Sequence, residues 1–82
     1  MNIDYEKFLS ELVKPLVCYP EEVVVKIFDE NEENIVVQIM VNEDDKGRII
    51  GKNGRIISAI KTIAYATASK NGKKIDVTVD SF

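Results

Sequence analysis

Apolar and polar residues alternate along this 82-residue chain in blocks whose spacing differs from one block to the next. The first block has helical spacing and predicts an amphipathic helix with one buried face. Pro15 falls inside this block, so the helix is expected to kink or to end early. Residues 19–21, Tyr-Pro-Glu, then predict a turn. The apolar positions of the first block are Tyr5, Phe8, Leu9, Leu12, Val13 and Leu16.

Two blocks rich in β-branched residues follow and predict strands over residues 23–28 and 35–41. Alternation puts one face of each strand in the core. These faces are Val23, Val25 and Ile27 in the first strand, and Val37, Ile39 and Val41 in the second. Residues 29–34 between them predict a polar hairpin loop. Its acids lack the regular ligand spacing of a calcium loop, so a solvated turn is favoured over a metal site.

The second half of the chain predicts two helices and a last strand. Asn42 and the acids after it are typical of a helix N-terminus, and this short helix should end at Ile50, where Gly51 stops it. The longest helix is predicted over residues 55–69. Alternation over residues 75–80 predicts a strand, with Ile75, Val77 and Val79 on one face. The apolar side of the long helix consists of Ile56, Ile57, Ile60, Ala64, Thr67 and Ala68.

Between the two helices, residues 49–57 read Ile-Ile-Gly-Lys-Asn-Gly-Arg-Ile-Ile. Because glycine has no Cβ, Gly51 and Gly54 would let backbone N–H groups approach a bulky anion. The anion would also meet the N-terminus of the long helix, where the dipole favours negative charge. Lys52 and Arg55 add positive charge. This glycine loop (residues 51–54) therefore predicts a site that holds a nucleic-acid backbone.

The charge distribution agrees with that prediction, although the whole chain has a net charge of −3. Residues 46–74 hold eight basic residues and no acidic one, while the rest of the chain holds all 14 acids. Such a basic segment can bind phosphate locally. Lys46, Lys70, Lys73 and Lys74 are candidate extra contacts. For the last three, the alternative is a solvated helix end that favours cations in any case.

Enzymatic chemistry is not expected. The chain has no histidine, no Gly-x-x-x-x-Gly-Lys phosphate loop, no cluster of metal ligands and no nucleophile beside a base, so no metal or cofactor is expected. Cys18 cannot form an internal disulfide and is expected to be a small buried residue in a reducing compartment. No apolar run approaches the roughly 20 residues that span a bilayer. We expect a cytoplasmic protein with no membrane contact.

The element order α-β-β-α-α-β, with Gly-x-x-Gly joining the fourth and fifth elements, resembles the type II KH domain. This is the bacterial arrangement of an RNA-binding fold. Further similarities are Pro20-Glu21-Glu22 before the first strand, the run from Lys46 to Gly51, and Gly54-Arg55 at the start of the long helix. The length matches small bacterial proteins that consist of a single KH domain. The resemblance implies one α+β domain over residues 1–82, a three-stranded sheet with helices packed on one face.

The resemblance also implies a function: gripping about four unpaired nucleotides of single-stranded RNA, as an RNA chaperone or post-transcriptional regulator. Single-stranded DNA remains an alternative ligand. Tyr65 is the only aromatic residue of the basic segment, so one copy should bind modestly and mainly through phosphates. The sequence leaves open which of Ile49 and Ile50 faces the core. The implied contacts are Arg48, Ile49, Ile50, Gly51, Lys52, Asn53, Gly54 and Arg55.

The long helix has a second face made of small or neutral residues where an ordinary surface helix would be charged. We call it the partner face: Ala59, Thr62, Ile63, Ala66 and Ser69. It predicts contact with another protein chain, and the alternative is a plain solvent-exposed face. The resemblance implies a homodimer or a heterodimer with a larger KH-containing protein. It leaves a second function open, an adaptor in a KH-protein complex with weak RNA contact.

Overall fold

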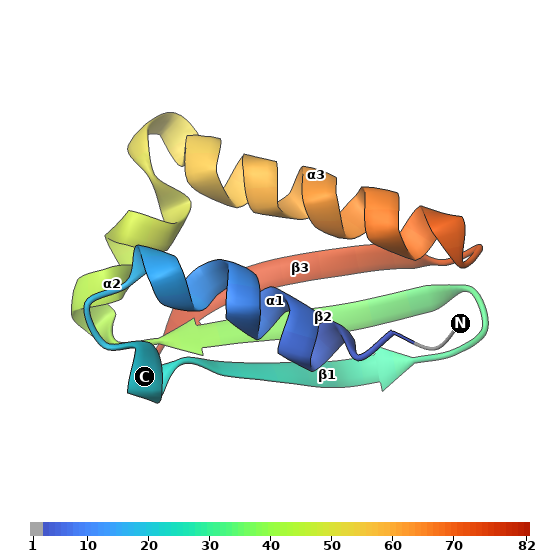
Figure 1. Cartoon of the computed structure of the whole chain (residues 1–82), viewed down its shortest axis with the longest axis horizontal. Coiled ribbons are helices and arrows are strands. Elements are labelled where there is room, and N and C mark those ends of the chain that lie inside the picture. The colour runs from blue at the N-terminus through green and yellow to red at the C-terminus, as the bar shows by residue number, and fades with distance from the viewer. Residues whose placement is uncertain (1–2) are drawn as a thin grey trace.

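The computed structural model describes residues 3–82 (Figure 1). Over these residues the helices and strands confirm the predicted α-β-β-α-α-β order and the α+β class. Short 3-10 turns occupy Lys14–Leu16, Pro20–Glu22 and Lys52–Gly54. The main elements are α1 (Tyr5–Val13), β1 (Val24–Glu30), β2 (Asn34–Val41), α2 (Glu43–Ile50), α3 (Arg55–Lys70) and β3 (Lys74–Ser81).

The three strands form one sheet in the order β1-β2-β3. β1 and β2 are antiparallel and are joined by the predicted hairpin, with a bulge between Ile27 and Asp29. β2 and β3 are parallel, and Asn34 pairs with Lys74 at one end of the register. Parallel neighbours need a long crossover connection. Here α2, the glycine loop and α3 form that crossover, so the loop lies where the chain turns back along the sheet (Figure 1).

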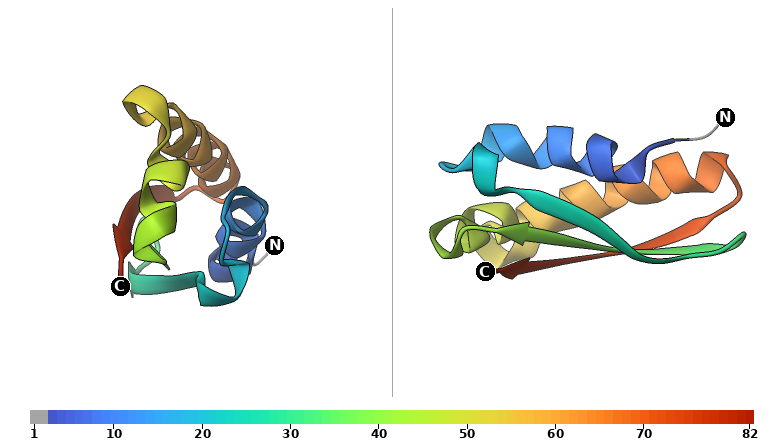
Figure 2. Two further views of the ribbon diagram at one scale, coloured as in Figure 1. Left: turned by 90° about the vertical axis from the view of Figure 1, so that its left-hand side faces the viewer. Right: turned by 90° about the horizontal axis from the view of Figure 1, so that it is seen from below.

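The helices cover one face of the sheet, and the core lies between the two layers (Figure 2). Alternate residues of β2 are fully or almost fully buried, as the period-two pattern predicts. The predicted inner faces of β1 and β3 and the apolar side of α3 also pack against this core. The buried residues are Tyr5, Leu9, Val13, Ile35, Val37, Ile39, Val41, Ile49, Ile60, Ala64, Ala68, Ile75 and Val77.

Two predictions near the end of α1 are wrong. Leu16 does not share the buried face of the helix and is 41% exposed, because α1 ends at Val13 and the segment with Pro15 continues as a 3-10 turn. Cys18 is exposed and not buried. At this position the backbone N–H makes the inward contact, donating to the Asp45 carboxylate at 2.9 Å, and the side chain stays at the surface.

Candidate nucleic-acid interface

The helix α2 holds the glycine loop at one end of the molecule. As predicted, Asn42 caps its N-terminus, since the Asn42 side-chain oxygen accepts the Asp44 N–H at 2.8 Å. The Asn42 side-chain nitrogen in turn donates to the carboxylate of Glu22, at 3.2 Å to each oxygen. At the other end, the Gly51 N–H donates to the Gly47 carbonyl at 2.8 Å. The loop thus begins at a firmly fixed point.

The loop itself is one 3-10 turn, Lys52–Gly54, with positive φ angles at Gly51, Asn53 and Gly54. The two glycines are needed for different reasons. A Cβ on Gly51 would lie 2.6 Å from the side chain of Ile56, whereas the nearest atom to a Cβ on Gly54 would be 4.0 Å away. Glycine is needed at position 54 mainly because the backbone there is left-handed, with φ 72°. Asn53 tolerates the same region with φ 57°.

The loop's backbone N–H groups differ in whether the chain itself provides their acceptor. Those of Gly54 and Arg55 donate to the carbonyls of Gly51 and Lys52, and that of Gly51 is used in α2. Within residues 3–82, the N–H groups of Lys52 and Asn53 have no acceptor. The free N–H groups are therefore those of the two residues between the glycines, while the N–H groups of the glycines are used within the chain. The side chains of Lys52, Asn53 and Arg55 are exposed.

Arg48 lies in the last turn of α2 and forms an ion pair with Asp45, a residue that the sequence did not single out as functional. Its Nε lies 3.6 Å from Oδ1 of Asp45, whose side chain is completely buried. The Asp45 carboxylate also accepts the N–H groups of Cys18 and Tyr19, at 2.9 and 3.0 Å. The burial of Asp45 could have been predicted from helical spacing, because Asp45 precedes the buried Ile49 by four residues and so lies on the same face of α2.

The structure separates the two isoleucines that end α2. Ile49 is fully buried in the core, so its prediction as a ligand contact is wrong: no part of its surface is open to solvent. Ile50 is partly buried and remains beside the loop. Of the pair, Ile50 is therefore the one that can form an apolar floor next to the glycine loop.

Lys46 forms an ion pair with a residue of β3, the last strand. Its Nζ lies 3.3 Å from Oδ1 of Asp80, and both side chains are partly exposed. The Ser81 N–H, which donates to the Asp80 carboxylate at 2.8 Å, and then the Lys46 ammonium lower the pKa of Asp80 from its ordinary value. Lys46 therefore has an acidic partner in the folded protein, which offsets part of the charge it could offer to phosphate.

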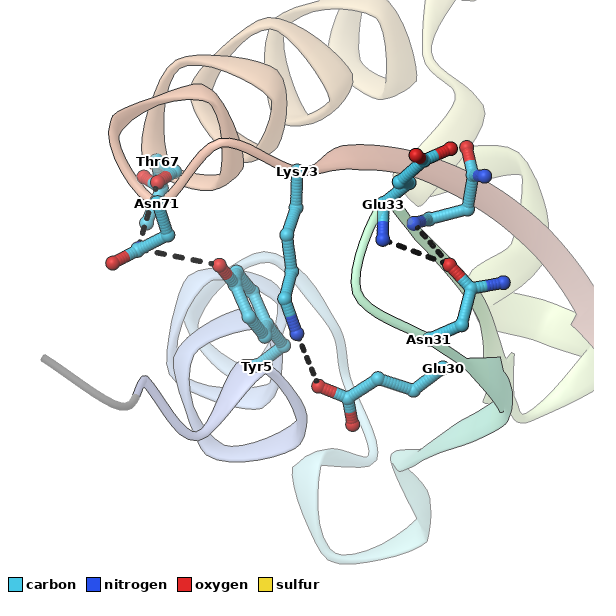
Figure 3. A network of polar contacts seen from close by, with 8 residues as sticks. Tyr5, Glu30, Asn31, Glu33, Thr67, Asn71 and Lys73 are labelled. Atoms are coloured by element: carbon cyan, nitrogen blue, oxygen red, sulfur yellow. Dashed lines mark hydrogen bonds and ion pairs between the residues drawn. The ribbon is translucent and has the colours of Figure 1, made fainter.

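The other three candidate lysines are not brought to the loop. Lys70, Lys73 and Lys74 lie around the far end of α3, and Figure 1 shows that end opposite the loop. The helix separates the two ends by about 22 Å, at 1.5 Å per residue. Figure 3 shows that Lys73 instead reaches Glu30, with Nζ 3.0 Å from Oε2. These three lysines therefore form a group separate from the glycine loop, and their contact with RNA stays a prediction.

The partner face lies along α3 on the side away from the sheet, and all five of its residues are exposed. Its polar groups are partly used within the helix, since the Thr62 hydroxyl donates to the Ser58 carbonyl at 3.0 Å. Ile63 contributes an apolar residue that is 44% exposed. This face therefore offers methyl groups and small side chains more than charge.

Residues 3–82 contain no group of three side chains that could hold a metal ion. Nor is any helix among them long and apolar enough to cross a membrane.

Comparison with known proteins agrees with this architecture. The family model described as "KhpA/KhpB, KH domain" matches residues 6–79. A protein named RNA-binding protein KhpA from Listeria monocytogenes is 43% identical over 74 residues, which cover 90% of this chain and 96% of that protein. The protein of the same name from Thermotoga maritima is 40% identical over 74 residues, with the same coverage of 90% and 96%.

Solved structures show the same fold. A crystal structure of Era in complex with MgGDPNP and nucleotides 1506–1542 of 16S ribosomal RNA superposes with a TM-score of 0.73 at 23% identity. The match covers 94% of this chain and 30% of the Era chain. The fold, the Gly-x-x-Gly connection and the family match over residues 6–79 lead to one assignment: this chain belongs to the KhpA/KhpB KH-domain family.

Proposed function

We propose that this protein binds single-stranded RNA through the glycine loop and performs no catalysis. The observation that carries the proposal is the pair of adjacent N–H groups on Lys52 and Asn53, which have no acceptor within residues 3–82, together with the exposed cationic side chains of Lys52 and Arg55. A phosphate group can accept both N–H groups while it meets the N-terminus of α3. The names of the KhpA relatives, which describe RNA-binding proteins, support the same ligand.

In the proposed complex each group has a distinct role. The N–H groups of Lys52 and Asn53 seat a phosphate, and the side chains of Lys52 and Arg55 add charge. Ile50 forms part of an apolar floor for the bases. Arg48 contributes less, because it already lies beside the Asp45 carboxylate. Such contacts read the backbone more than the sequence of about four nucleotides, which suits an RNA chaperone or post-transcriptional regulator in the cytoplasm.

The partner face favours a second role, assembly with another KH protein. Five exposed, uncharged residues along α3 allow a second helix to approach closely. The other chain is a second copy of this protein or a larger KH-containing protein. Pairing two glycine loops would raise the local concentration of binding sites and so the apparent affinity for a long RNA. An adaptor whose RNA contact is incidental is the competing function.

The double variant Lys52→Asp with Asn53→Asp tests the RNA proposal. It places two carboxylates where a phosphate would lie and leaves both glycines in place. We expect RNA binding to be lost while the circular dichroism spectrum is unchanged. Lys26→Asp reverses an exposed charge on β1 and serves as the control. Undiminished RNA binding by the folded double variant would rule the proposal out, and loss of binding with the cellular role intact would favour the adaptor.

A further inference from the structure

A cavity of about 350 Å³ lies between the C-terminal half of α3 and the start of β3. It is lined by Tyr65, Ser69, Lys73, Lys74 and Ile75. Tyr65 is 46% exposed, and Ile75 is almost fully buried. This size and this mixture of aromatic, aliphatic and a few polar groups are typical of sites for small ligands or single groups of larger ones. None of its lining residues belongs to the glycine loop.

One flank of α3 connects the glycine loop with this cavity. Ser58, Lys61 and Tyr65 recur three or four residues apart, so they lie along one side of the helix, and Ser69 marks the border between this flank and the partner face. Tyr65 follows Gly54 by eleven positions, which corresponds to about 16 Å along the axis. A strand that leaves the loop along this flank therefore passes Lys61 and then reaches the ring of Tyr65.

The charges beside the cavity favour a polyanion. Lys73 is neutralised by Glu30, but Lys74 at the cavity and Lys70 at the end of α3 are both exposed. The nearest acid along β3 is Asp76, two residues after Lys74 on the same side of the strand, so its carboxylate offsets part of the charge of Lys74. The cavity wall itself contributes two lysines and no carboxylate.

We propose that this cavity is a second nucleotide subsite for the strand held at the glycine loop. A base beyond the nucleotides at the loop stacks on the Tyr65 ring, and Lys74 contacts the adjacent phosphate. Stacking on a tyrosine suits any base, so the subsite adds affinity with little sequence preference. This inference rests on the proposed RNA binding and adds a length requirement to it: only an RNA long enough to span the flank of α3 reaches the cavity.

The test compares a tetranucleotide with a decanucleotide of uridine, each with a fluorescent label, by anisotropy. We expect Tyr65→Ala to weaken binding of the decanucleotide about 5- to 10-fold and to leave the tetranucleotide within about 2-fold. Tyr65→Phe keeps the ring and should bind both RNAs as the unmodified protein does. Phe28→Ala removes another exposed aromatic ring, 64% exposed on β1, and should change neither affinity.

The charge arm of the test uses Lys74→Gln, with Lys26→Gln as its matched control on β1. Lys74→Gln should reduce the slope of log K for decanucleotide binding against log salt by about 0.7, the value for one phosphate contact on a single strand. Lys26→Gln should leave that slope unchanged.

The two proposals fail in different ways. If the glycine loop does not bind RNA, Lys52→Asp with Asn53→Asp leaves tetranucleotide binding intact. If the cavity is not a subsite, Tyr65→Ala affects neither RNA or affects both equally. Light scattering of the Tyr65→Ala variant gives one more decisive result. If this variant loses decanucleotide binding and its molecular mass in solution is half that of the unmodified protein, Tyr65 contacts a second copy of the chain and the subsite proposal is overturned.

Discussion

Gly51 lies directly against Ile56, so closely that a Cβ on Gly51 would come 2.6 Å from Cγ1 of Ile56. Ile56 belongs to the first turn of α3 and packs against the core. The glycine thus joins the end of α2 to the start of α3 by leaving space for the isoleucine. Its backbone, with φ 74° and ψ 175°, is also one that essentially only glycine adopts.

A glycine-to-alanine series separates these effects. We expect Gly51→Ala to lower the free energy of unfolding by about 3 kcal/mol or more, from strain and overpacking together. Gly54→Ala should cost about 1–2 kcal/mol, for its left-handed backbone alone. Gly47→Ala, inside α2 with open space around it, should stabilise by about 0.5–1 kcal/mol. Urea unfolding measures all three, and equal losses at Gly51 and Gly54 would contradict the packing argument.

Asp45 should be among the most sensitive positions on α2. Asp45→Ala leaves the N–H groups of Cys18 and Tyr19 without their acceptor in a partly buried position, and we expect a loss of about 2–4 kcal/mol. Asp44→Ala removes the neighbouring exposed carboxylate and should cost about 0.5 kcal/mol or less. Thermal unfolding of the two variants gives the comparison. A similar melting temperature for both would show that the two hydrogen bonds contribute little.

Asp80 gives the protein a small pH-dependent contribution to stability. Its pKa in the folded state is lowered by the Ser81 N–H and by Lys46. The stabilisation is therefore complete above the ordinary aspartate pKa of about 3.9 and is lost as the pH falls through the lower, folded value. We expect Asp80→Asn to be less stable than the unmodified protein near neutral pH, with the difference shrinking below about pH 4. A difference in stability between the two proteins that grows as the pH falls would contradict this interpretation.

The salt dependence of RNA binding should rank the cations around the loop. For a single strand, each lost phosphate contact lowers the slope of log K against log salt by about 0.7. Lys52→Ala should produce a change of that size. Arg48→Ala should produce a smaller one, because Asp45 already offsets its guanidinium. Titrations at several salt concentrations measure the slopes, and a larger change at Arg48 would place the strand along α2 instead.

The partner face predicts a change of mass on substitution. Ala66→Glu puts a carboxylate in the middle of this uncharged surface and should yield monomers in light scattering. Ala66→Ser keeps the side chain small and neutral and should leave the assembly intact. An unchanged mass for the folded Ala66→Glu variant would remove α3 as the contact.

The sequence predicted the fold well because its buried faces follow simple periods. Every second residue of β2 is buried, and Ile60, Ala64 and Ala68 recur at helical spacing on α3. Gly51 and Gly54 likewise identified the loop and its bend, because few other residues adopt positive φ. These features are local, so a linear pattern contains them.

The remaining errors involve contacts between distant segments. Asp45 looked like an acid that favours a helix N-terminus, but its hydrogen-bond partners lie 26 and 27 residues earlier in the chain. The exposure of Cys18 follows from the same contact. Lys73 looked like a free cation, and Glu30 reaches it from 43 positions away. Pairing of this kind depends on topology, which spacing along the chain does not encode.

The parallel pairing of β2 with β3 bears on how the protein matures during synthesis. Until residues 74–81 have left the ribosome, the sheet is only the hairpin of β1 and β2, and such hairpins are at best marginally stable in water. The helices α2 and α3 then have no complete three-stranded sheet to pack against. A nascent chain that has already exposed its glycine loop would therefore be unable to hold RNA, and the ability would arise only after β3 has left the ribosome.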